Sequence, residues 1–139
     1  MEALISGFLI WICLQIGCEP PPPPAINWVS QQTLAERFYG AKPPTEAYVC
    51  GMYDDETRTI LLPYGCCPDD LLNQSTLLHE LVHHVQVATG MVYPCSAARE
   101  RLAYELQAQW LQENGVEDPY AAMGVDEFTI MIRSFCWEE

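Results

Sequence analysis

TLLHELVHHV, residues 76–85, is the stretch around which the chain is organised, and it contains every histidine of the protein. A helix turns by about 100° per residue, so His79 and His83 would lie one turn apart on one face. Two imidazoles placed in this way can bind one Zn²⁺ from the same side. Glu80 lies at the edge of that face, within reach of a water molecule on the metal. The motif therefore predicts metal ligands His79 and His83 and a general base, Glu80.

The residues around the motif predict a helix with one apolar face and one metal-binding face. The apolar positions on the opposite arc are Leu77, Leu78, Leu81, Val82, Val85 and Ala88. Ser75 or Asn73 can cap the beginning of this helix, and Gly90 can end it in the left-handed conformation. His84 points away from the ligand pair and is not expected to bind the metal. The alternative is an amphipathic helix whose histidines are incidental.

Composition places the chain among globular proteins. Its 139 residues are 50% hydrophobic and 18% charged, which predicts a single domain over residues 1–139 with a real core. The net charge of −13, with six basic residues, argues against nucleic acid and anionic membrane surfaces as partners. This acidity favours solubility, or else a preference for basic substrates, and the sequence alone does not separate the two.

Seven cysteines make a disulfide possible, and none of them forms a Cys-x-x-Cys pair typical of zinc ribbons. Cys95 and Cys136 each follow an apolar stretch that should pack on the core. We therefore expect a Cys95–Cys136 disulfide if the protein is exported, with two buried free thiols as the equally weighted alternative. The adjacent pair Cys66 and Cys67 cannot easily reach ordinary disulfide geometry.

Residues 1–18 are rich in apolar side chains and lack a basic residue. They predict a helix of the domain that ends at Gly17, with a signal peptide or membrane anchor as the second interpretation. Membrane association is expected only through this segment. The protein would be cytoplasmic if residues 1–18 are retained, and exported if these residues are a signal peptide. Residues 19–27 follow as a proline-rich strap to the body, residues 28–139.

The body has the pattern of an α+β fold that is mainly helical. A small antiparallel β-hairpin, residues 47–53 and 58–62 around a turn at 54–57, is expected to pack beside the motif helix. Further helices are predicted at residues 31–39 with Ser30 as cap and Gly40 as end, at 96–112, as one turn at 119–123, and at 127–135 with Asp126 as cap.

A catalytic zinc ion usually takes three protein ligands, and no further histidine exists to complete the set. The helix at residues 96–112 offers two carboxylates. Helical spacing places Glu100 within its apolar arc and Glu105 among polar residues. A buried carboxylate needs a partner, and a metal ion is one, so we expect Glu100 to be the third ligand. The alternative is an ion pair of Glu100 with Arg99 or Arg133.

Other polar residues near the expected site have secondary roles. Gln107 lies two turns after Glu100 on the same face and is a candidate hydrogen-bonding partner of a ligand. Arg101 and Glu105 are four residues apart and can pair on the surface. A tyrosine, Tyr93 or Tyr104, could assist by stabilising an oxyanion, and spacing does not choose between them.

Residues 76–85, followed by Glu100-Arg101-Leu102-Ala103-Tyr104, resemble the gluzincin group of zinc peptidases. That group carries His-Glu-x-x-His on one helix and a glutamate, often with a small residue three positions later, on the next; Ala103 fits the small position. The hairpin resembles the group's active-site sheet, whose edge strand holds extended peptide. More narrowly, residues 53–107 resemble small, uncharacterised bacterial metallopeptidases. The chain departs from large gluzincins in lacking most of their sheet and a histidine that would steady the transition state.

The resemblance implies a minimal zincin-like domain that hydrolyses a peptide or protein substrate with a zinc-activated water. The alternative is a non-catalytic module of the same fold, which binds zinc structurally or binds none and serves in assembly. The oligomeric state stays open.

Overall fold

The computed structural model describes residues 1–40, 51–65 and 69–137, and it has the mixed α+β class that the sequence predicts. The elements, in chain order, are α1 (Glu2–Ile16), β1 (Ala25–Val29), α2 (Gln31–Tyr39), β2 (Met52–Asp54), β3 (Thr59–Pro63), α3 (Leu71–Ala88), the 3₁₀ helix η1 (Ser96–Arg99), α4 (Glu100–Glu113), α5 (Pro119–Met123) and α6 (Glu127–Ser134).

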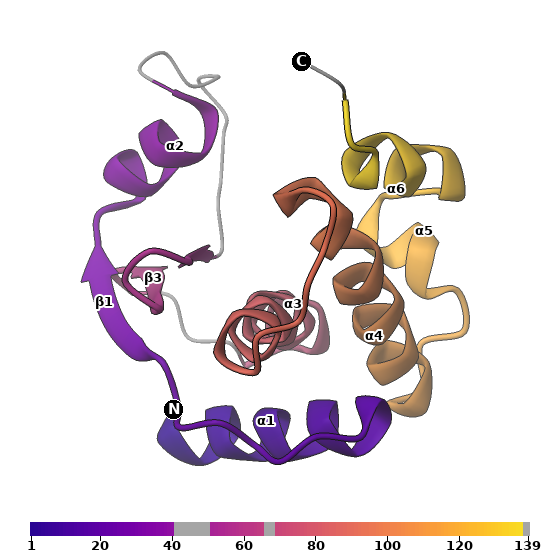
Figure 1. The fold of residues 1–139 in the computed structure, drawn as a ribbon, viewed down its shortest axis with the longest axis horizontal. Coiled ribbons are helices and arrows are strands. Elements are labelled where there is room, and N and C mark those ends of the chain that lie inside the picture. Colours follow the sequence, from indigo (N-terminus) through magenta and orange to yellow (C-terminus); the bar gives the residue numbers. More distant parts are fainter. Residues whose placement is uncertain (41–50, 66–68, 138–139) are drawn as a thin grey trace.

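Helix α3 carries the motif and lies at the centre of the molecule, with α1, α4 and the sheet around it (Figure 1). Its apolar face is buried as predicted, since Leu78, Leu81 and Val85 are 0% exposed. These side chains belong to one core that also receives residues from α1, β3 and α4. Burial of this face fixes the rotation of α3 about its axis, and with it the direction of the histidine face.

The beginning of α3 differs from the prediction. Asp70 is the N-cap, and its side chain accepts a hydrogen bond of 2.8 Å from the backbone N–H of Asn73. Ser75 instead lies inside the helix, where its hydroxyl donates to the carbonyl of Leu72. An aspartate ahead of two leucines satisfies the capping requirement one turn earlier than the serine would. The end is as expected, because Gly90 follows the last turn with a φ of 71°.

The sheet contains one strand more than the predicted hairpin. β2 and β3 pair antiparallel, with Tyr53 opposite Ile60, as expected for a hairpin. β1 pairs with the other side of β3 in parallel, which makes the order β1-β3-β2 and leaves β2 at an edge. The predicted strap over residues 19–27 is therefore wrong from Ala25 onward, because Ile26, Trp28 and Val29 favour strand and complete the ladder. Residues 47–50 of the predicted strand lie outside the described residues.

Helix α1 packs on α3 and ends at Gly17, whose φ is 79°, as predicted for a helix of the domain. The indole N–H of Trp11 donates a 3.0 Å hydrogen bond to Glu113, at the end of α4. A disulfide that the sequence analysis did not foresee joins Cys13 to Cys18, with Cα atoms 4.7 Å apart. Among the described helices, none combines the length and the hydropathy that crossing a bilayer would require.

Two expectations for the remaining helices need correction. The helix expected over residues 96–112 is divided into η1 and α4, so Glu100 is the first residue of α4. Arg101 pairs with Glu127 at 2.9 Å rather than with Glu105, because α6 packs against α4 and brings its acidic first turn within reach. Glu105 is exposed, as expected.

The C-terminal helix is held to the centre of the fold by a disulfide. α6 has the predicted cap, Asp126, and ends at Ser134, one residue earlier than expected. Cys136, just beyond it, is bonded to Cys95, just before η1, with a Cα separation of 5.8 Å. The expected Cys95–Cys136 pairing is therefore confirmed. It fastens the end of α6 next to the beginning of α4.

Candidate metal centre

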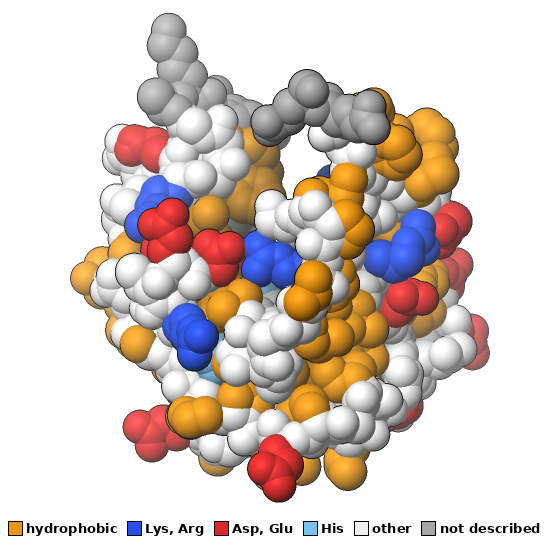
Figure 2. Space-filling model, in the orientation of Figure 1, with side chains coloured by type: hydrophobic (Ala, Val, Ile, Leu, Met, Phe, Trp, Pro, Cys, Tyr) orange, Lys and Arg blue, Asp and Glu red, His pale blue; other side chains and the backbone are white. Residues whose placement is uncertain are grey.

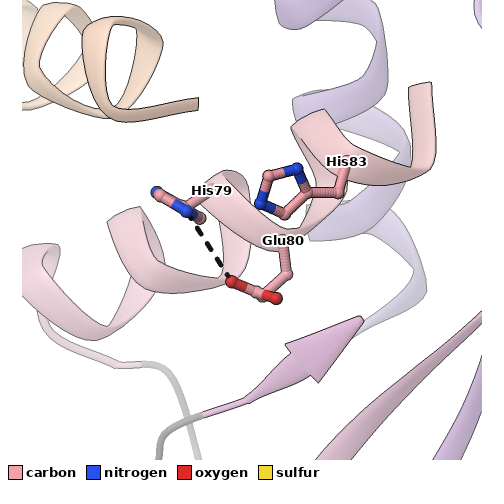
Figure 3. A group of neighbouring side chains, drawn as sticks. All are labelled: His79, Glu80 and His83. Atoms are coloured by element: carbon pink, nitrogen blue, oxygen red, sulfur yellow. Dashed lines mark ion pairs between the residues drawn. The ribbon is translucent and has the colours of Figure 1, made fainter. Parts of the chain in front are cut away.

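His79 and His83 project from successive turns of α3 with Glu80 between them (Figure 3). One ligand atom from each of these three side chains lies within 4.8 Å of the other two, a grouping that could hold a metal ion. Both imidazoles are at least nine-tenths buried as residues, and their rings are 5.1 Å apart between centroids. The helical spacing of the motif thus brings together the side chains that the sequence predicts.

Glu100 completes the group from the first turn of α4. Its two carboxylate oxygens lie 2.9 Å from Nε2 of His79 and 2.8 Å from Nε2 of His83. The ion pairs that formed the alternative for this residue are absent among the described residues, since Arg99 pairs with Asp55 and Arg133 donates to Tyr104. Glu100 thus lies beside both histidines, where a third ligand would have to be, and its role as a ligand stays a prediction.

Each histidine is oriented by a buried glutamine. Nδ1 of His79 lies 2.8 Å from Oε1 of Gln107, the candidate partner, and Nδ1 of His83 lies 2.9 Å from Oε1 of Gln86. An amide oxygen can only accept, so both Nδ1 atoms carry the proton and both Nε2 atoms face Glu100. The glutamines are in turn fixed by their NH₂ groups, which donate to Ser75 and to the carbonyl of Arg99.

Gln86 is a residue that the sequence analysis missed. It is 0% exposed and also donates to the hydroxyl of Tyr93, so its three hydrogen bonds all lie inside the protein. The signal that could have found it is its position three residues after His83 on the helix, where side chains meet. A polar residue expected to be buried there needs a partner, and a ligating imidazole is one.

Glu80 is oriented by the edge strand of the sheet. Its Oε1 accepts a 2.9 Å hydrogen bond from the backbone N–H of Tyr53 in β2. Its Oε2 lies 4.0 Å from Nε2 of His79. One oxygen is therefore held by the backbone, and the other faces the point on which the histidine nitrogens converge.

His84 is placed away from the cluster, as predicted, and has a structural role. Its Nε2 lies 2.7 Å from the carbonyl oxygen of Pro22 and donates to it, while Nδ1 accepts from the hydroxyl of Tyr53 at 2.9 Å. Burial lowers the pKa of His84 from its usual value, which favours this neutral form. His84 thereby ties the proline stretch and β2 to the motif helix.

The charges within the cluster are strongly coupled. Burial alone would raise the pKa of Glu100, but hydrogen bonds from His79 and His83 outweigh it and hold that pKa well below its usual range. Burial likewise opposes the charged form of His83, yet the contacts with Glu100 and the charge of Glu80 raise its pKa to about 9. In the absence of a cation, Glu100 is thus ionised and His83 carries a compensating proton.

The cluster opens into a cavity of about 950 Å³, a volume suited to a small ligand or a peptide segment. Residues of β2, α3, α4 and α6 line it, among them Tyr53, Thr76, Tyr104 and Arg133. The ring of Tyr104 lies 4.7 Å from that of His79, and its hydroxyl accepts a 2.7 Å hydrogen bond from Arg133. Of the two candidate tyrosines, Tyr104 is therefore the one at the site, whereas Tyr93 lies outside the cavity lining.

The donor atoms suit a divalent transition metal. Imidazole nitrogens and carboxylate oxygens are ligands that such ions accept, and the glutamines occupy Nδ1 of His79 and His83, so that Nε2 of each ring is the atom that would bind the ion. The Glu100 oxygens lie at hydrogen-bond distance from both nitrogens, so a small outward shift of this side chain would make room for an ion between them.

Comparison with known proteins gives one family. The family described as Domain of unknown function (DUF6647) matches residues 1–138, nearly the whole chain. No curated protein and no solved structure matches the chain.

Proposed function

Since the chain belongs to the DUF6647 family, whose description names no activity, we propose its function from the site: the protein is a zinc-dependent peptidase with a minimal zincin-like fold. One observation carries this proposal. The Nε2 atoms of His79 and His83 converge on the carboxylate of Glu100, and the carboxylate of Glu80 lies beside them in the lining of a cavity.

His79, His83 and Glu100 would hold the ion, as the sequence predicts. Two histidines and one carboxylate form a ligand set of catalytic zinc sites, in which a further position is left for water or substrate. The hydrogen bonds from Gln107 and Gln86 support this role, because they select the Nε2 atoms as ligands and fix the ring planes before any ion arrives.

Glu80 would act as the general base. When bound, zinc would supply a Lewis acid that polarises a carbonyl and lowers the pKa of a bound water toward neutrality. Glu80 takes the proton from the attacking water on its Oε2 and passes it to the departing amide nitrogen. The hydrogen bond from Tyr53 keeps Oε1 occupied throughout, so the proton stays on the oxygen that faces the reaction.

Tyr104 would stabilise the negative charge that develops on the substrate carbonyl. Its oxygen accepts a hydrogen bond from Arg133, which leaves the phenolic proton free to donate into the cavity. This residue would take the place of the transition-state histidine that large gluzincins carry and this chain lacks.

An extended peptide would enter along β2. This strand is the edge of the sheet, it contributes Met52 and Tyr53 to the cavity lining, and α3 lies against it. An edge strand offers backbone groups to a peptide in the extended conformation; in β2 the N–H of Tyr53 is not among them, because it is bonded to Glu80. The substrate expected from these features is a peptide or a mobile protein segment. The acidic composition argues against nucleic acid as a substrate.

A second candidate function has one observation in its favour. Glu100 bridges both histidines directly, at 2.9 and 2.8 Å, so the cluster is satisfied by its own residues. This arrangement also suits a non-catalytic module, in which the triad fastens α4 to α3 without a metal or around a structural zinc ion.

Metal analysis combined with an activity assay separates the two candidates. The purified protein should contain about one zinc per chain and cleave casein or members of a peptide library, and Glu80→Gln should keep the zinc and lose the cleavage. Zinc without cleavage in the unaltered protein would favour the structural module. Absence of zinc after growth and dialysis with added zinc would favour the metal-free triad.

A further inference from the structure

Arg133 is a cation of the cavity without a carboxylate partner among the described residues. It projects from α6 into the lining, where its guanidinium donates a 2.7 Å hydrogen bond to the neutral hydroxyl of Tyr104. The other arginine of the lining, Arg99, is neutralised by Asp55 at 2.9 Å. Outside the cavity, Arg37 and Arg101 also have carboxylate partners, at 3.3 and 2.9 Å. Several such pairs of basic and acidic side chains can be followed in Figure 2.

The charge of the cavity therefore differs from that of the chain. The protein as a whole has a net charge of −13. Within the cavity, the charges of Asp55 and Arg99 cancel, and those of Glu80 and Glu100 would be cancelled by one divalent ion. Arg133, which is itself exposed to solvent, then leaves the lining with a net charge of about +1.

The fold keeps Arg133 in this position. The Cys95–Cys136 disulfide fastens the chain three residues after Arg133 to the chain just before η1, and α6 packs against both η1 and α4. The guanidinium is thus anchored to the helix that carries Glu100; one of its five N–H groups donates to Tyr104, and four are left to offer a ligand.

We propose that Arg133 binds a carboxylate of the substrate, so that the site selects peptides with a negative group near the scissile bond. This inference rests on the proposed peptidase function and names its substrate class. Arginine presents two parallel N–H groups that match a carboxylate. Arg133 contacts the hydroxyl of Tyr104 at 2.7 Å, and the ring of Tyr104 lies 4.7 Å from that of His79, so a carboxylate on Arg133 would be bound close to the metal site.

Binding, rather than cleavage, tests this proposal. Zinc-loaded Glu80→Gln protein is dialysed against three mixtures of acetylated random octapeptides, and bound peptides are quantified by mass spectrometry. The first mixture has free C-terminal carboxylates and no Asp or Glu. The second is its C-terminal amide, and the third is the amide with Glu allowed at internal positions. We expect the first or the third mixture to bind at least about tenfold more tightly than the second, and their comparison identifies a terminal or a side-chain carboxylate as the ligand.

Arginine variants on the Glu80→Gln background complete the test. Arg133→Gln should abolish the preference for carboxylates, and Arg133→Lys should restore only part of it, because lysine cannot bind in the bidentate manner. Arg101→Gln is the matched control, since Arg101 lies outside the cavity lining, and it should leave the preference unchanged. Equal binding of all three mixtures, binding of none, or a preference that survives Arg133→Gln would overturn the proposal. If the preference disappears with Arg133 and the unaltered protein, with Glu80 intact, cleaves no peptide, the carboxylate site is supported and only the peptidase function is rejected.

Discussion

The backbone N–H of Tyr53 donates a 2.9 Å hydrogen bond to Oε1 of Glu80, across 27 residues of sequence. This bond joins the edge strand of the sheet to the motif helix at the residue that we assign as general base. A backbone donor belongs to the strand and not to a mobile side chain, so it orients the carboxylate at little entropic cost. The second oxygen of Glu80 is consequently directed toward the histidine pair, 4.0 Å from Nε2 of His79.

The roles of the three motif residues can be separated by zinc content. His79→Ala or His83→Ala should abolish stoichiometric zinc, because each removes one of three ligands. Glu80→Gln should retain it, because Glu80 is not a ligand and the amide oxygen of the introduced glutamine can still accept from the backbone N–H of Tyr53. Atomic absorption on the dialysed variants measures this. Equal zinc loss in all three variants would contradict the assigned roles.

The two carboxylates of α4 provide a matched pair. Glu100→Ala should weaken zinc binding by more than the roughly 10–100-fold that follows loss of a ligand's hydrogen-bonding partner. Glu105→Ala should leave the affinity unchanged, since Glu105 is exposed and lies outside the cavity lining. Competition with a chromophoric chelator gives both dissociation constants. If Glu105→Ala weakened zinc binding and Glu100→Ala did not, α4 would have to present a different face to α3.

The buried glutamines should tune the metal site without touching the metal. Gln86→Leu or Gln107→Leu should weaken zinc binding by about 10–100-fold, because the ring of the attached histidine loses its orientation and its fixed tautomer. Gln109→Leu, on the same helix as Gln107, is the control, because its amide contacts Gln15 and Glu113 instead. Competition with the chromophoric chelator measures these affinities as well. Unchanged zinc affinity in both leucine variants would show that the glutamines do not position the histidines.

Zinc affinity should rise with pH. In the metal-free protein the contact with Glu100 and the charge of Glu80 outweigh burial and raise the pKa of His83 from 6.5 to about 9. Zinc needs the neutral imidazole, so binding displaces a proton, and the affinity should increase roughly tenfold per pH unit and level off near pH 9. Glu80→Gln removes one of the charges that raise this pKa, so the plateau should begin at lower pH. Isothermal titration calorimetry in buffers of different ionisation heat counts the released protons. A flat profile between about pH 6.5 and 8.5 would be incompatible with the coupling.

The two disulfides should differ in their contribution to stability. Cys95 and Cys136 are 41 residues apart and Cys13 and Cys18 are 5 apart. In the chain-entropy account the longer loop corresponds to about 4 kcal/mol of unfolding free energy and the shorter to about 2 kcal/mol. Cys136→Ser should therefore lower the urea midpoint more than Cys18→Ser does. The opposite order would mean that constraint of the unfolded chain is not the main effect.

Local patterns determined a large part of this structure. Helical periodicity alone places His79 and His83 on one face and Leu78, Leu81 and Val85 on the other, because these positions are related by turns of one helix. The same reasoning separates Glu100 from Glu105. Caps such as Ser30 and Asp126 were also predictable, since each accepts from an N–H three residues later, with no contribution from the rest of the chain.

Other features were settled only by tertiary structure. Three contacts join segments that are distant in sequence. They are the pairing of β1 with β3, the hydrogen bond from His84 to the carbonyl of Pro22 and the hydrogen bond from Tyr53 to Glu80. Nothing in the local composition distinguishes these partners from competing ones, because their choice depends on which groups the folded core leaves buried and in need of a hydrogen bond. The sequence by itself thus determined which side chains can bind a metal. The packing of α3 between the sheet and α4 decided which groups hold those side chains in place.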